Sequence, residues 1–124
     1  MSGTRAIVDT NLVLYVLQGD RSAADLLADR DIILSYITCM ELLAEPALPA
    51  SELAARKAFI ESWPMIDMHP AIMETGIRFR RDFKLKLPDA IIAATAHFLD
   101  VPLFTADKGF ESVRKEIKVI LYER

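Results

Sequence analysis

Four carboxylates are spaced along the chain so that each follows or borders a short apolar run. Asp9 ends the first run, and Glu41, Asp89 and Asp107 stand in three later segments that repeat the arrangement. Clustered carboxylate oxygens without Cys or His favour a hard cation such as Mg²⁺ or Mn²⁺ over zinc. Such an ion orients water and neutralises charge on a phosphate that is being displaced. The pattern therefore predicts hydrolysis of phosphodiester bonds.

Each of these acids also has an ordinary structural interpretation. Asp9 could cap the helix that follows it, and Asp89 could complement a helix dipole from the first turn. Thr38 and Glu41 form the S/T-x-x-E pattern of a capping box, and Asp107 could be the acceptor of an Asx-turn. Both sets of interpretations are open at this point, but only the functional one requires the four acids to converge.

Predicted strands and helices alternate along the chain. The strands are an apolar run that stops at Asp9, then 32–35, 65–67, 101–104 and 118–122. The first helix begins after Asp9, and the second covers 22–28 with Ser22 as the cap. The third runs from 38 to the prolines at 46 and 49, and the fourth covers 52–62 with Ser51 as the cap. Two more helices cover 70–83 and 89–99, and a helical turn covers 110–115. This alternation predicts a parallel sheet with helices on both faces.

A parallel sheet would bring the four acids to one edge, because the carboxyl ends of parallel strands all lie there. Two carboxylates about 4 Å apart repel by about 4 kcal/mol at an effective dielectric constant of about 20. A marginally stable domain needs compensation for such repulsion, and a cation supplies it. Asn11 and Thr105 lie two positions from Asp9 and Asp107, where they could hold a metal-bound water or a phosphate oxygen.

The bulk composition restricts the function classes. A chain of 124 residues with 52% hydrophobic content is predicted to form a single domain over 1–124. The formal charge of -3 means that any contact with nucleic acid requires a local basic patch. A single cysteine and no signal-like apolar stretch near the N-terminus predict a cytoplasmic protein. The longest apolar segment, 90–99, is too short to span a bilayer, so no membrane role is expected.

A local basic patch precedes Asp89. Among five positive charges between 78 and 86, Arg81, Lys84 and Lys86 are predicted to hold RNA phosphates, since phosphate contacts position a strand without reading its sequence. The alternative is an ordinary solvated helix face.

Four segments together, IVDTNLVLY, CMELLA, LPDAIIAATA and LFTADKGF, resemble the PIN-domain family, and within it the short VapC-type toxins of toxin–antitoxin pairs. The resemblance covers essentially the whole chain. It implies a three-layer α/β/α sandwich with a five-stranded parallel sheet. It also implies a Mg²⁺- or Mn²⁺-dependent endoribonuclease that is the toxin component of a type II, VapBC-like system.

The resemblance also assigns residues and partners. Asp9, Glu41, Asp89 and Asp107 match the family's acidic quartet, and Thr105 matches its supporting hydroxyl position. Family members form homodimers and are silenced by a cognate VapB-like antitoxin whose C-terminal segment covers the acidic site. The proline-rich segment 45–51, EPALPAS, departs from the pattern, which leaves substrate fit and dimer packing open.

Two rival functions share part of this pattern. A haloacid-dehalogenase-like phosphotransferase would place a second Asp two residues after the nucleophile, where this chain has Asn11. A PIN-like module could instead bind RNA or a protein partner without cutting. Metal-dependent cleavage distinguishes the enzyme from the binding module.

Overall fold

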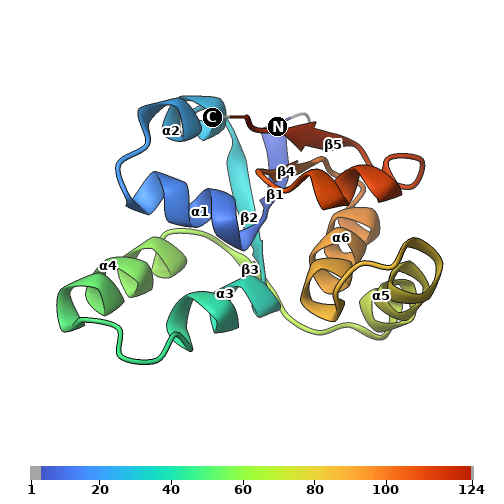
Figure 1. Cartoon of the computed structure of the whole chain (residues 1–124), viewed down its shortest axis with the longest axis horizontal. Helices are drawn as coiled ribbons and strands as arrows, with labels where there is room; N and C mark the ends of the chain where they lie inside the picture. The colour runs from blue at the N-terminus through green and yellow to red at the C-terminus, as the bar shows by residue number, and fades with distance from the viewer. Residues whose placement is uncertain (1–3, 124) are drawn as a thin grey trace.

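A five-stranded sheet with helices on both faces forms the body of the protein (Figure 1). The computed structural model describes residues 4–123. In chain order the elements are β1 Arg5–Val8, α1 Thr10–Leu17, α2 Arg21–Leu27, β2 Asp31–Ser35, α3 Tyr36–Leu43, α4 Ala50–Glu61, β3 Met65–Ile66, α5 Pro70–Phe83, α6 Leu87–Leu99, β4 Leu103–Thr105, the 3-10 helix η2 Lys108–Val113 and β5 Val119–Leu121. The predicted α/β/α sandwich is confirmed.

The strand order is β3-β2-β1-β4-β5, and every strand pairs with its neighbours in parallel. The central strand β1 aligns Ile7 with Ile33 of β2 and with Leu103 of β4. Because all strands run the same way, the loops that leave their carboxyl ends share one edge of the sheet. This edge carries the ends of β1 and β4, next to Asp9 and Asp107.

Two hydrophobic clusters fill the space between the sheet and its helices. Successive side chains of a strand point to opposite faces. Ile7 accordingly belongs to the cluster under α5, α6 and η2, whereas Ala6 and Val8 belong to the cluster under α1, α2 and α3. Figure 1 shows the same division, with α1 to α4 on one side of the sheet and α5, α6 and η2 on the other. The middle of helix α6 is buried all round, since the five consecutive residues 92–96 are buried, as its apolar sequence predicts.

Three predicted helix starts are wrong. The cap of α2 is Asp20, whose side chain accepts a hydrogen bond from the Ala23 N–H, and Ser22 lies inside the helix. Helix α4 begins at Ala50 without a side-chain cap, so Ser51 does not cap it. In both places the backbone turns helical one or two residues earlier than predicted, which leaves the serine without the extended backbone that a capping residue adopts.

The third wrong start is that of α3. It is capped by Ser35, the last residue of β2, whose hydroxyl accepts from the Ile37 N–H at 3.3 Å. Thr38 therefore lies inside the helix, and the capping-box interpretation of Glu41 is wrong. Elsewhere the predicted boundaries agree with the observed ones within about two residues. None of the helices within residues 4–123 has the length and apolar character needed to cross a membrane.

Candidate active site

Asp9 is a buried carboxylate at the junction of β1 and α1, with 3% of its surface exposed. One of its oxygens accepts a hydrogen bond from the Leu12 N–H at 2.9 Å, which confirms that it caps α1. The other accepts from the Thr105 hydroxyl at 2.5 Å. The pKa of Asp9 is raised to about 6. Burial is the largest cause, the two hydrogen bonds act in the opposite direction, and the negative charges of Asp89 and Asp107 raise the pKa further.

Thr105 connects Asp9 to the next acid. It ends β4, the strand beside β1, and its hydroxyl oxygen accepts a hydrogen bond from the Asp107 N–H at 2.9 Å. Asp107 in turn caps η2 by accepting from the Gly109 N–H at 2.8 Å, so its predicted local turn role is confirmed. The capping bonds of Asp9 and Asp107 do not exclude function, because the same bonds hold both acids at the carboxyl edge of the sheet.

Asp89 lies in the first turn of α6 and is half-buried. Burial is the main cause that raises its pKa, followed by the negative charges of Asp107 and Glu41, whereas Lys86 opposes them. Asp89 therefore interacts electrostatically with one acid after β4 and one on α3. The pKa of Asp9 is raised by Asp89 and Asp107 in turn, so repulsion links the four predicted acids through Asp89, which the separate capping interpretations do not require.

Glu41 comes from the exposed side of α3 and is held by a residue that the sequence prediction omitted. The hydroxyl of Thr10 donates to Glu41 Oε1 at 2.6 Å and lies 3.3 Å from the hydroxyl oxygen of Thr38. The available signal was the position of Thr10, directly after a carboxylate at a strand end. The predicted supporting residue Asn11 is exposed in the first turn of α1, and its side chain makes no hydrogen bond with any other residue between 4 and 123.

The donor set suits a hard cation bound in an open site. Among the described residues, no group of three or more His, Cys, Asp or Glu side chains is arranged so that it could hold an ion by itself. Mg²⁺ does not need such a cage, because it is usually bound through one or two carboxylates together with waters and substrate phosphates. The four carboxylates therefore fit Mg²⁺ or Mn²⁺ by their chemistry, and they do not form the closed cage of a structural zinc site.

The predicted basic residues lie around the start of α6. Lys86 is close enough to Asp89 to lower the pKa of that carboxyl. Lys84 ends α5 in the left-handed conformation, with φ 59°, and Arg81 is exposed in the last turn of the same helix.

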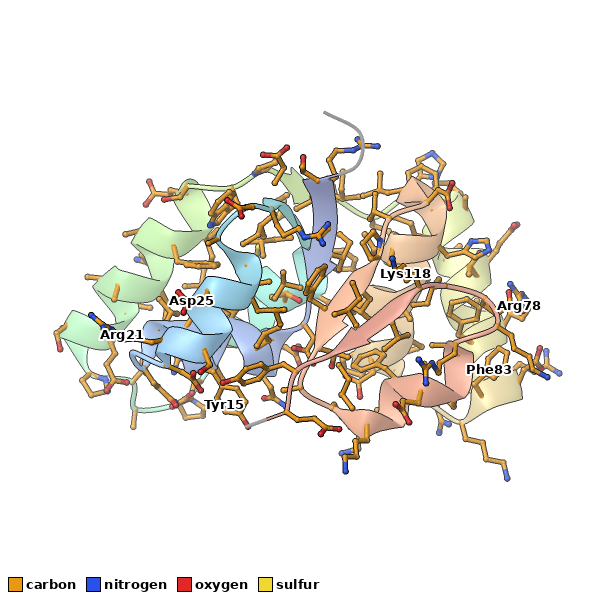
Figure 2. The ribbon with its side chains drawn as sticks, turned by 90° about the horizontal axis from the view of Figure 1, so that it is seen from above. Tyr15, Arg21, Asp25, Arg78, Phe83 and Lys118 are labelled. Carbon is orange, nitrogen blue, oxygen red and sulfur yellow. The ribbon has the colours of Figure 1, made fainter. Side chains whose placement is uncertain are left out.

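Arg78 serves a different contact. It lies on the outer side of α5 (Figure 2), and its guanidinium donates to Glu116 at 2.9 Å. This ion pair ties α5 to the segment before β5.

The histidines and the cysteine have structural surroundings. The Nδ1 of His69 accepts a hydrogen bond from the Ala71 N–H at 3.0 Å and so caps α5. The centroid of the His69 ring lies 4.6 Å from that of the Phe98 ring. His97 packs edge-on against Phe79. Burial raises the pKa of the Cys39 thiol. The candidate site is therefore built from carboxylates and hydroxyls.

A family model described as PIN domain matches residues 6–116. No curated protein matches the chain.

Among solved structures, a chain of a toxin–antitoxin complex from Klebsiella pneumoniae is 30% identical, with a TM-score of 0.83 and coverage of 96% of this chain and 99% of that one. A chain of the DNA-bound VapBC complex from Salmonella typhimurium is 23% identical, with a TM-score of 0.79 and coverage of 94% and 96%. A chain of VapBC-5 from Mycobacterium tuberculosis is 21% identical, with a TM-score of 0.70 and coverage of 98% and 99%. The last two show likeness of fold.

Proposed function

Because the chain belongs to the PIN-domain family, we propose that it is a Mg²⁺- or Mn²⁺-dependent endoribonuclease and the toxin component of a type II, VapBC-like toxin–antitoxin pair. The observation that carries the proposal is the electrostatic coupling of Asp9, Glu41, Asp89 and Asp107 at one edge of the sheet. The 30% identical chain from a toxin–antitoxin complex supports the biological role.

The four acids would hold the metal, which supplies an oriented water and neutralises charge on the phosphate when it is bound. Thr105 keeps Asp9 in place through the 2.5 Å hydrogen bond to one of its oxygens. Since the pKa of Asp9 is raised to about 6, this carboxyl is mainly ionised at pH 7 and available as a ligand. A bound cation would relieve the repulsion among the acids.

The RNA strand would be held by the basic residues at the start of α6. Lys86 lies beside Asp89, and Lys84 and Arg81 extend the positive charge along the end of α5. Contacts of this kind bind phosphates without reading the bases, so they position the strand and leave the choice of cleavage site to other residues.

Two protein partners belong to the proposal. The first is a cognate VapB-like antitoxin that covers the acidic edge. The second is another copy of the chain, because large apolar side chains are exposed on α3 and α5, and such side chains mark contact surfaces when they form a patch. The large apolar side chains exposed on these two helices are Met40, Leu43, Met73 and Ile77.

The proposal is tested by incubating the purified chain with a defined set of structured RNAs in Mg²⁺, in Mn²⁺ and in EDTA. We expect cleavage with either metal and none in EDTA. Tight RNA binding without cleavage under all three conditions would instead identify a PIN-like binding module.

A further inference from the structure

The hydrogen bond between Thr10 and Glu41 joins two elements that are distant in sequence. Thr10 is the first residue of α1, and Glu41 lies near the end of α3, 31 positions later. The oxygens of the two side chains are 2.6 Å apart. Thr10 directly follows Asp9, which caps the same helix. A single turn after β1 thus supplies one predicted metal ligand and reaches a second.

The donor in this bond is rigid. Threonine is β-branched, so its χ1 angle has few accessible values. The hydroxyl of Thr38, which is fully buried, lies 3.3 Å from that of Thr10. A hydroxyl carries one hydrogen, and the shorter distance to Glu41 directs it to the carboxylate. Thr10 is therefore fixed both by its own stereochemistry and by a buried neighbour.

The acceptor, by contrast, has no structural reason to be fixed. Glu41 is exposed, and α3 is already capped by Ser35. A long, exposed glutamate samples many rotamers, and ordering it costs side-chain entropy. The bond to Thr10 selects one of these rotamers in advance. Preorganisation of this kind increases affinity for whatever the carboxylate binds.

We propose that Thr10 is a positioning residue that holds Glu41 ready to bind the divalent cation. The inference rests on the proposed function, because it takes Glu41 as a ligand. Thr10 acts through Glu41 and does not itself touch the metal. Groups that orient metal ligands from outside the coordination shell typically change metal affinity or activity by about 10- to 100-fold when they are removed.

The test measures Mn²⁺ affinity of the full chain by isothermal titration calorimetry. Thr10→Val removes the hydroxyl and keeps the shape of the side chain, and Thr10→Ser keeps the hydroxyl. The matched control is Thr4→Val, since the Thr4 hydroxyl makes an equally short 2.6 Å bond to Asp31, before β1 and away from the acids. Thermal melting in EDTA checks that each variant is folded.

We expect Thr10→Val to weaken Mn²⁺ binding about tenfold, with wild-type affinity in Thr10→Ser and Thr4→Val. In a Glu41→Gln background, Thr10→Val should have no further effect, because the residue acts only through that carboxylate. This double variant keeps the inference testable if Thr10→Val is also less stable. Equal Mn²⁺ affinity of Thr10→Val and wild type, or the same loss with and without Glu41, would overturn the inference.

The titration and the RNA cleavage assay together separate this inference from the proposed function. If the wild type binds Mn²⁺ but cuts no RNA, the proposed function fails and the role of Thr10 stands on the titration. If the wild type cuts RNA and Thr10→Val binds Mn²⁺ normally, the role of Thr10 fails and the proposed function stands. A wild type that binds no Mn²⁺ would overturn both the role of Thr10 and the proposed metal site.

Discussion

The hydroxyl of Thr105 donates a 2.5 Å hydrogen bond to Asp9, a residue 96 positions earlier in the chain. The contact exists because β4 lies beside β1 in the sheet and aligns Phe104 with Val8. Asp9, which follows β1, and Thr105, which ends β4, therefore lie side by side at the same level of the sheet. The bond stabilises the ionised form of a carboxylate whose pKa is raised by burial.

Replacing Thr105 by Val should raise the pKa of Asp9 above its present value of about 6, because the hydroxyl bond lowers that pKa. The acidic limb of the pH–rate profile should move to higher pH, since the free enzyme's essential ionisations set this profile. Thr105→Ser, which keeps the hydroxyl, is the control. An unchanged acidic limb in Thr105→Val would show that the bond does not set the ionisation of Asp9.

The free energy of unfolding of the metal-free chain should depend on pH through Asp9. Its pKa is about 6 in the fold against 3.8 when unperturbed, so the folded state binds more protons between these values. The contribution of Asp9 to stability is therefore greatest below about pH 4 and falls as the pH rises to about 6. The loss amounts to about 3 kcal/mol.

Urea denaturation in EDTA at pH 4.5 and pH 7.5 measures this effect. Asp9→Asn, which keeps a side chain able to cap α1, should lose the part of the pH dependence that is due to Asp9. The difference between wild type and variant isolates this group from the other titrating residues. Identical pH dependence in both proteins would contradict a raised pKa for Asp9.

Replacing Glu41 by Gln should abolish metal-dependent cleavage and leave the fold intact. The side chain is exposed and does not cap α3, so the stability of the fold does not depend on its charge. Circular dichroism melting in EDTA and RNA cleavage in Mg²⁺ are the two measurements. A clear loss of stability with cleavage retained would return Glu41 to a structural role.

Replacing Lys84 by Gly should weaken RNA binding without destabilising the protein. Lys84 adopts the left-handed conformation with φ 59°, which glycine adopts without strain. We expect the free energy of unfolding to rise by up to about 1 kcal/mol. The slope of log RNA affinity against log salt concentration should fall by about 1, the amount due to one phosphate contact. Lys84→Arg keeps the charge as a control. Unchanged RNA affinity in Lys84→Gly would remove Lys84 from the interface.

The residues that could be predicted from sequence are those whose signal is local. Apolar runs mark the strands; Asp9 follows such a run directly and Asp107 follows one within three residues. The role of Glu41 was harder to predict, because the S/T-x-x-E pattern of a capping box also occurs inside a helix. Only the structure shows that Ser35 caps α3 and that Thr38 lies one turn further on.

Thr10 could not be predicted as a partner of Glu41, because its role depends on a contact between α1 and α3 across 31 positions. The predicted helix caps were wrong for a different reason. Ser22 and Ser51 are good capping residues by type, but the observed starts lie one or two residues earlier. A short polar residue near a helix start identifies the region of the cap and not the capping position itself.

The most direct test of the acidic site compares RNA cleavage by the wild type, Asp89→Asn and the matched control Asp25→Asn, an exposed acid on α2. All three are assayed in Mg²⁺, in Mn²⁺ and in EDTA. Asp89→Asn should melt no lower than the wild type in EDTA, because the substitution relieves repulsion from Asp107 and Glu41.

We predict that the wild type and Asp25→Asn cut RNA only when metal is present, and that Asp89→Asn does not cut. Cleavage by Asp89→Asn at the wild-type rate, or cleavage by the wild type in EDTA, would contradict a metal-dependent site built from these carboxylates.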